Sequence, residues 1–226
     1  MIRKEETGLK RTLFLLVLSL IFILSISIVS SASDSNKVAY IYKKNFKIDQ
    51  NIINVFTSLG LQVELIQEDV LFSKDLSQYR FLFVGDENFK KNIPVNNYPS
   101  VIANYYLTDL WGLTDNEGTS QLGATSPLSV LINSHKFQVY NSAFFKQSAT
   151  LTIPYYYLEK NNKAISLRQI AATETTSSGF KVGDVISYAD KGSQLMNGKR
   201  ANENICFYGI IESDYWTQKA KDLFKE

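Results

Sequence analysis

The sequence has one cysteine and one histidine in 226 residues, and this scarcity excludes several kinds of chemistry. A lone Cys206 cannot form an intramolecular disulfide, so the stability of the domain must come from packing. Cys206 and His135 together cannot supply the nitrogen and sulfur ligands of a tetrahedral zinc site. Because Cys206 lies within an apolar run, we expect it to be a small buried side chain rather than a reactive thiol.

Only one long apolar run is present, Leu13 to Val29, and a basic flank precedes it. With the small residues that follow, this order is the pattern of a signal peptide, with cleavage expected after Ala32. A helix of this length spans roughly 26 Å, near the lower limit for crossing a bilayer. Two alternatives stay open for residues 1–32: a cleaved signal peptide and a retained membrane anchor. Both place residues 33–226 outside the cytoplasm, because the basic flank stays inside.

An excess of charge is also missing from the body of the chain. Without residues 1–32, Lys plus Arg falls from 24 to 20 and Asp plus Glu from 22 to 20, so the formal charge drops from +2 to zero. A neutral body offers no electrostatic footprint for nucleic acid, and membrane contact is expected only through the N-terminal segment. No Asn-x-Ser/Thr sequon occurs, which favours a prokaryotic envelope.

Short apolar segments typical of strands alternate with one amphipathic helix in the first half of the chain. We predict strands at 37–42, 62–66, 80–84 and 99–103 and a helix at 48–59. This order predicts an α/β domain over residues 33–226, with a flavodoxin-like, mostly parallel sheet and helices on both faces.

The middle of the chain has β-like segments with little helical periodicity, which predict appended antiparallel strands. These segments are 130–133, 137–140, 151–158, 164–172 and 184–188. A strand at 205–211 follows, and then a helix from Asp214 that Ser213 or Asp214 would cap. No stop signal precedes Glu226, which leaves a further segment or domain open.

Three segments resemble the class I glutamine amidotransferase-like superfamily, and its ThuA-like branch in particular. Tyr79–Gly85 is similar to a hydrophobic strand of those domains that ends in glycine. Asn133–Phe137 resembles their His-Pro-Ile segment, with Lys136 where proline is expected. Gly198–Arg200 followed by Phe207–Ile211 resembles their final turn and strand. The resemblance implies the fold predicted above.

The resemblance also implies a cysteine nucleophile at a sharp elbow, a histidine base and an orienting acid. The chain departs from that pattern. The candidate elbow strand, Val101–Tyr106, has no cysteine at its exit, and the last strand leads into Glu212 without a histidine. Cys206 lies inside a predicted strand, and His135 belongs to another segment. Glutaminase activity is therefore not expected.

Acidic residues follow the third predicted strand. Asp86 and Glu87 would emerge at its carboxyl end, where open α/β sheets place ligand crevices. A buried carboxylate there could act as a general base. The alternative has Asp86 capping the next turn and Glu87 solvated, and Ser213 serving as a helix cap. The candidate ligand-binding set is Asp86, Glu87, Asn104, Glu212 and Asp214.

Two other kinds of site are weaker. Asp115–Gly118 has alternating oxygens and a turn glycine, but it lacks the terminal glutamate of a calcium-binding EF-hand loop, so a solvated turn is the default. The loop after the first strand, Lys43–Phe46, has no glycine to cradle a phosphate. We therefore expect no flavin, nucleotide or other cofactor.

Aromatic residues make up 13% of the chain and could stack on sugar rings. The candidates are Trp111, Tyr105, Tyr106 and the triplet Tyr155–Tyr157. Core packing is the alternative, and strand alternation predicts that at least one tyrosine of the triplet is buried.

Two functions follow from these observations. The leading hypothesis is an exported, non-catalytic amidotransferase-like domain that serves as a binding or structural module of a cell-envelope protein, with an unknown ligand. The alternative is a carboxylate-dependent hydrolase centred on Asp86 and Glu87, acting on carbohydrate or a related extracellular substrate. An assembly module with a large exposed apolar patch is a third.

Overall fold

The computed structural model describes residues 35–115, 119–122, 127–132, 135–140, 155–174 and 181–226. The chain divides into two units, Met1–Asp34 and Ser35–Glu226, of which the second is described below. The predicted export segment, residues 1–32, lies outside the described residues, so both alternatives for it stay predictions. No helix in the described part of the chain is long and apolar enough to cross a membrane.

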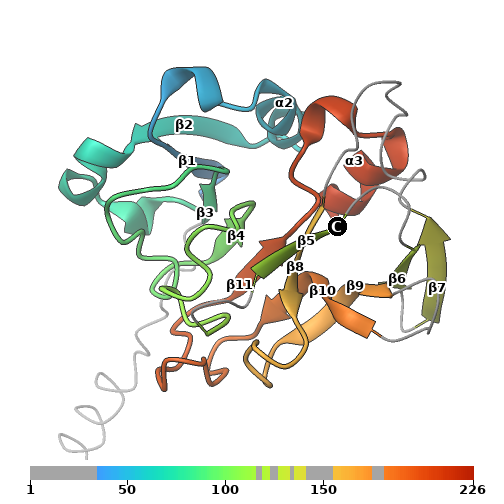
Figure 1. Cartoon of the computed structure of the whole chain (residues 1–226). Coiled ribbons are helices and arrows are strands. Elements are labelled where there is room, and N and C mark those ends of the chain that lie inside the picture. Colours follow the sequence, from blue (N-terminus) through green and yellow to red (C-terminus); the bar gives the residue numbers. More distant parts are fainter. Residues whose placement is uncertain (1–34, 116–118, 123–126, 133–134, 141–154, 175–180) are drawn as a thin grey trace, which may run out of the picture. The chain divides into compact units, whose positions relative to one another are not determined.

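Five parallel strands form one half of the sheet, in the spatial order β2-β1-β3-β4-β11 (Figure 1). Their bounds are β1 Lys37–Tyr42, β2 Gln62–Gln67, β3 Phe81–Val84, β4 Ser100–Ile102 and β11 Ile205–Tyr208. This is the flavodoxin-like order, and the predicted α/β fold class is confirmed. The chain leaves β1 for β2 on one side and returns to β3 on the other, so the order reverses between β1 and β3.

Six antiparallel strands continue the sheet beyond β11. Their bounds are β5 Thr119–Leu122, β6 Pro127–Ile132, β7 His135–Tyr140, β8 Tyr155–Glu159, β9 Arg168–Glu174 and β10 Lys181–Ala189. β10 pairs with β11 and β9, β6 joins β9 to β7, and β5 lies beside β8, which also pairs with β10. The strands appended to the parallel core are thus antiparallel, as predicted.

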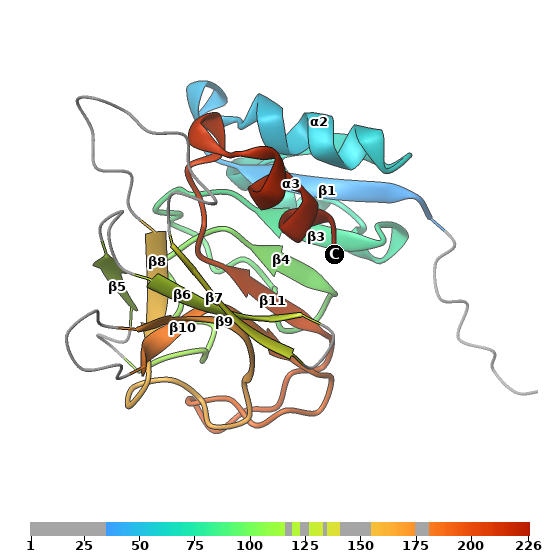
Figure 2. The same ribbon diagram turned by 90° about the vertical axis from the view of Figure 1, so that its right-hand side faces the viewer.

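Helical elements cover the parallel strands. They are η1 Asn45–Lys47, α2 Gln50–Ser58, η2 Glu68–Ser73, η3 Leu76–Gln78, η5 Ser213–Tyr215 and α3 Gln218–Lys225. α2 and α3 contact each other on one face of the sheet (Figure 2). There Phe56 of α2 and Phe224 of α3 pack on Phe83 of β3, with ring centroids 5.4 and 6.2 Å away. Val38 to Ile41 of β1 are all buried, so the opposite face is covered as well; η2, which buries Leu71, contacts β1 and β2.

The final helix differs from its prediction. It begins at Gln218 because Thr217 caps it: the Thr217 side chain accepts a hydrogen bond from the N–H of Ala220 at 3.3 Å. Ser213 and Asp214 lie in the preceding 3-10 helix η5, so the prediction that either caps the last helix is wrong. The last strand also ends earlier than expected, at Tyr208.

The antiparallel strands differ most from the prediction. The strand predicted at 164–172 begins at Arg168, because the residues before it form turns that leave Ile165 fully exposed. β5 was not predicted. Its sequence, Thr-Ser-Gln-Leu, has no apolar alternation, and its strand character comes from pairing with β8.

Candidate functional site

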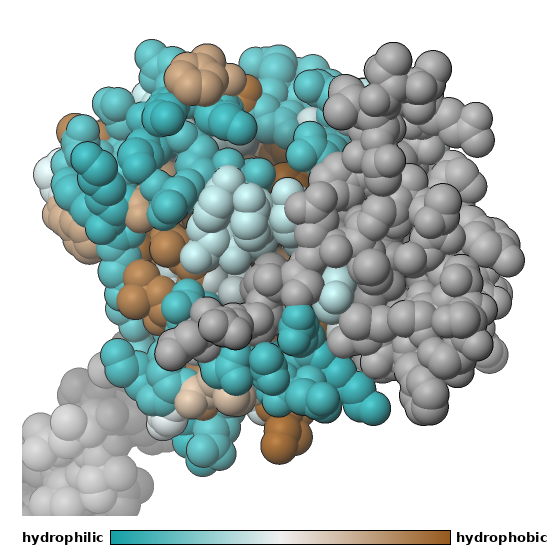
Figure 3. Space-filling view, in the orientation of Figure 1, coloured by the Kyte–Doolittle hydropathy of each residue, from teal (hydrophilic) through white to brown (hydrophobic). Residues whose placement is uncertain are grey.

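A cavity of about 390 Å³ lies at the carboxyl edge of the parallel strands. Its walls come from the loop after β1, the first turn of α2, the exits of β3 and β4, and the segment after β11; Figure 3 looks onto this edge. The polar lining residues include Lys47, Asp49, Asn51, Asp86, Glu212, Ser213 and Asp214. The cavity therefore lies where the strand order reverses, which is where open α/β sheets bind ligands.

Asp86 follows β3 and contributes the most unusual carboxyl group of the cavity. Its Oδ1 is buried and has no hydrogen-bond partner among the described residues. Burial raises the pKa of Asp86 to about 7; the charges of Glu212 and Glu87 also raise it, and Lys47 opposes them. The group can therefore gain or lose a proton near neutral pH, and its buried oxygen can accept a hydrogen bond from a ligand.

Two more carboxyl groups of the cavity have raised pKa values. Asp49 is the N-cap of α2 and accepts a hydrogen bond from the N–H of Ile52 at 3.1 Å. Burial raises the pKa of Asp49, and burial likewise raises that of half-buried Glu212. The charge of Asp214 adds to both effects. The carboxylates of this cavity thus repel one another, and Lys47 is the opposing charge in its lining.

Asp214 and Ser213 tie the segment after β11 to α2. Asn51 of α2 donates through Nδ2 to Asp214 Oδ1 at 2.7 Å and to Ser213 Oγ at 3.3 Å. A hydrogen bond from Ser213 also lowers the pKa of Asp49 against the effect of burial. Ser213 therefore holds two elements together and is not placed as a nucleophile.

Glu87 lies behind the cavity. Its side chain is buried, and its carboxylate accepts hydrogen bonds from the N–H groups of Lys43 at 2.8 Å and Lys44 at 3.0 Å. These donors belong to the loop after β1, the position where flavodoxin-like domains bind phosphate. The alternative in which Glu87 is solvated is wrong: this chain fills the position with its own anion.

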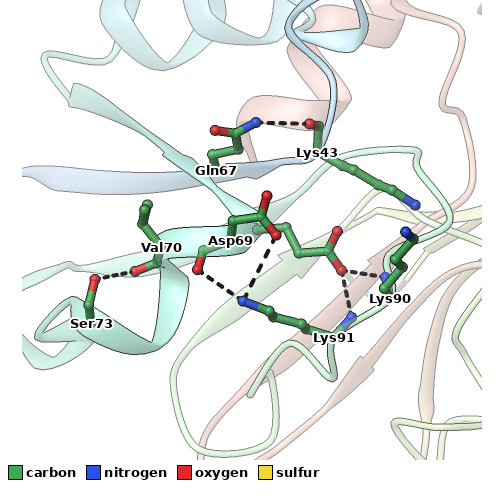
Figure 4. Close-up of polar contacts among 8 residues, drawn as sticks. Lys43, Gln67, Asp69, Val70, Ser73, Lys90 and Lys91 are labelled. Atoms are coloured by element: carbon green, nitrogen blue, oxygen red, sulfur yellow. Dashed lines mark hydrogen bonds and ion pairs between the residues drawn. The ribbon is translucent and has the colours of Figure 1, made fainter.

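Glu68 repeats this arrangement on the other side of the same loop. Its buried carboxylate accepts hydrogen bonds from the N–H groups of Lys90 and Lys91, the latter at 2.5 Å. Lys91 reaches back with Nζ to the backbone oxygen of Asp69 at 2.9 Å (Figure 4). The segment that carries Asp86 is therefore fixed to the loop after β1 by Glu87 and to η2 by Glu68.

Asn104 connects Asp86 to the segment after β4. Its fully buried side chain donates to the backbone oxygens of Gly85 at 2.8 Å and Glu87 at 2.7 Å, one on each side of Asp86. Its Oδ1 accepts a hydrogen bond from the N–H of Tyr106 at 3.0 Å. Asn104 thus positions Asp86 and does not itself line the cavity.

The structure brings Asp86, Glu212 and Asp214 to one cavity and places Glu87 and Asn104 behind it. Asp49 and Lys47 also line the cavity, and neither was predicted from the sequence. A signal for Asp49 was present: it is an acidic residue at the start of the helix after the first strand, which is the same edge of the sheet.

The aromatic candidates divide into core and surface. Trp111 is buried and donates from Nε1 to the oxygen of Ile93 at 3.1 Å, so it cannot form a sugar platform. Tyr156 and Tyr157 are buried, while Tyr105 and Tyr106 remain partly exposed. The side chain of Tyr155 lies outside the described residues.

The acidic side chains do not gather as metal ligands do. Of the calcium candidate Asp115–Gly118, residues 116–118 lie outside the described part of the chain. Among the residues that the structure describes, no group of three His, Cys, Asp or Glu side chains could hold a metal ion.

The thiol and the imidazole of an amidotransferase are not brought together. Cys206 lies within β11, and burial raises its pKa to about 12. His135 begins β7, and β10, β9 and β6 lie between these two strands in the sheet. At about 4.8 Å per strand, the two backbones are roughly 19 Å apart along the sheet.

No protein-family model and no curated protein matches the sequence. Among solved structures, the chain is similar to a candidate GMP synthase protein from Thermoplasma acidophilum. The TM-score is 0.41 and the identity 13%, over 84% of this chain and 90% of that one. A likeness of this degree bears on neither activity nor ligand.

Proposed function

We propose that this protein is an exported binding module of the cell envelope, and that its ligand occupies the cavity at the carboxyl edge of the sheet. The observation that carries the proposal is the buried, unpartnered Oδ1 of Asp86 in a cavity of about 390 Å³. A cavity of this volume falls in the range typical of small-molecule sites. A buried acceptor without a partner is satisfied when a ligand donates to it.

The ligand of this site is neutral or cationic. The N–H groups after β1 are occupied by Glu87, and the first turn of α2 is capped by Asp49. Both positions at which a phosphate would bind are therefore filled by carboxylates of the chain itself. Repulsion among Asp86, Glu212, Asp49 and Asp214 would be relieved by a donor or a positive charge.

The finer family assignment, to a non-catalytic member of the ThuA-like branch, is part of this proposal. Its support is the three resembling segments together with the missing thiol–imidazole pair. Export is supported by residues 1–32 alone, through the apolar run and its basic flank.

Ligand-observed NMR with a library of neutral, cationic and anionic small molecules tests the binding function. We expect neutral or cationic hits whose binding Asp86→Asn and Glu212→Gln weaken at least tenfold, while the exposed control Asp222→Asn leaves it unchanged. Hits that are mostly phosphates, or that bind both cavity variants as well as the parent protein, would contradict the proposal.

The alternative, a carboxylate-dependent hydrolase of carbohydrate, is favoured by one observation. A pKa of about 7 suits Asp86 to act as a general acid, and Glu212 rather than Glu87 would be its partner, because Glu87 is held by Lys43 and Lys44. Release of nitrophenol from a panel of nitrophenyl glycosides tests it. Turnover that Asp86→Asn abolishes would favour the hydrolase over the binding module.

A further inference from the structure

Three tyrosine rings form a continuous stack beside the cavity. Tyr105 lies between Tyr156 and Tyr106, with ring centroids 4.0 Å away on both sides and interplanar angles of 6° and 29°. Tyr156 at one end is 8% exposed, whereas Tyr106 at the other end is 43% exposed. In Figure 3 weakly polar side chains gather over the loop that follows β4, the loop that carries Tyr105 and Tyr106.

The stack is rigidly connected to the cavity. Asn104 binds the backbone on both sides of Asp86 and also accepts from the N–H of Tyr106. Ala103, two residues before Tyr105, lines the cavity. Burial raises the pKa values of Tyr105 and Tyr156, and the charge of Asp86 contributes to both shifts, so the stack lies within the field of that carboxylate.

Each part of this arrangement selects a different feature of a ligand. A flat ring that is supported from behind by two others presents an apolar surface at little entropic cost. The π face of tyrosine is also attractive to a positive charge. The carboxylates accept hydrogen bonds from hydroxyl and ammonium groups, and the anion positions are already filled by Glu87 and Asp49.

We infer that the site takes a pyranose ring that carries a protonated amine, with the C–H face of the ring on Tyr106 and its amine and hydroxyl groups toward Asp86 and Glu212. The inference rests on the proposed function, because it names the ligand class of the same cavity. A neutral sugar would leave the repulsion among the carboxylates in place. A cation without a ring would leave Tyr106 unused.

Calorimetric titration with three probes tests the inference. The disaccharide of glucosamine has ring and charge, N,N′-diacetylchitobiose has the ring without the charge, and spermidine has the charge without the ring. We expect the glucosamine disaccharide to bind at least tenfold more tightly than either of the others.

Variants of Tyr106 separate stacking from folding. Tyr106→Ala should weaken binding of the glucosamine disaccharide about tenfold and leave that of spermidine unchanged, whereas Tyr106→Phe should retain affinity for both. Phe72→Ala, at an exposed aromatic of η2 that does not line the cavity, is the matched control. The thermal midpoint of each variant verifies folding.

Three results would overturn the inference: no binding of the glucosamine disaccharide, equal binding of either comparison probe, or full affinity in Tyr106→Ala. If the NMR library still yields hits that depend on Asp86, the binding function stands and the ligand class alone is wrong. If it yields none, the binding function fails as well.

Discussion

Tyr105 lies flat against Tyr156, with ring centroids 4.0 Å apart and planes only 6° from parallel. This contact joins the loop after β4 to β8, which belongs to the antiparallel strands. The approach depends on Gly209, whose backbone oxygen accepts from the N–H of Tyr156 at 2.9 Å. The two halves of the sheet therefore meet at the edge where the cavity opens.

Gly209→Ala should destabilise the protein by about 2 to 4 kcal/mol and disturb the tyrosine stack. A Cβ at this position would lie 2.0 Å from the backbone oxygen of Tyr156 and 2.8 Å from that of Val185, so the backbone must move. Urea unfolding measures the free energy, and near-ultraviolet circular dichroism reports the stack. Gly192→Ala is the control: its surroundings are open, and its φ of 89° costs only about 1 kcal/mol. Equal losses in the two variants would contradict the close-approach argument.

Asp86 should make the protein more stable as the pH falls from about 7 toward 4. Its folded-state pKa of about 7 lies above the ordinary aspartate value of 3.8, so in this range the folded state binds more protons than the unfolded state. The contribution is therefore present below the unfolded pKa and is lost as the pH rises through 7. Asp86→Asn should be more stable than the parent at pH 8, by on the order of 2 to 4 kcal/mol, and the gain should vanish near pH 4.

Urea unfolding of both proteins between pH 4 and 8 measures this difference. Asp222→Asn, at an exposed aspartate of α3, controls for the loss of one carboxylate. A constant difference between Asp86→Asn and the parent across this range would show that Asp86 titrates normally.

The parallel strands could be predicted because their sequences carry the signal locally. Phe81–Val84, for example, is a short apolar run that is buried on both faces of the sheet and bounded by polar residues. The carboxyl edge follows from the strand order, so Asp86 and Glu212 could be assigned to one side of the sheet from the sequence alone.

The different roles of Asp86 and Glu87 could not be predicted. The two are neighbours with the same chemistry, yet one lines the cavity and the other binds N–H groups 43 and 44 residues earlier in the chain. That choice depends on how two distant loops meet, which no local pattern encodes. The same holds for Asn104, whose partners lie 17 and 19 residues away.

Cys206 should be unreactive in the folded protein. Because burial raises its pKa to about 12, very little thiolate forms at pH 8. We expect alkylation by iodoacetamide to be at least about a hundredfold slower in the folded protein than in urea, as measured by mass spectrometry. Rapid alkylation under native conditions would reveal an accessible thiol and reopen the possibility of a cysteine nucleophile.

Glu87→Gln should destabilise the protein by about 1.5 to 3 kcal/mol, because the N–H groups of Lys43 and Lys44 lose a charged acceptor. The control is Glu203→Gln, which removes a partly exposed carboxylate 2.6 Å from Lys191 Nζ and should cost less than about 1 kcal/mol. If both substitutions cost the same in urea unfolding, the buried carboxylate has no special role.

A second variant asks whether Glu87 really occupies an anion position. Glu87→Ala leaves the two N–H groups without an acceptor beside a vacated space, so an added anion should be able to replace the carboxylate. We expect inorganic phosphate to raise the thermal midpoint of Glu87→Ala by several degrees more than that of the parent or of Glu203→Gln. Binding only to the folded state has this effect, whereas general stabilisation by salt raises all three equally. An equal rise would mean that Glu87 anchors the loop without filling a phosphate position, and the argument that the ligand is not an anion would lose its main support.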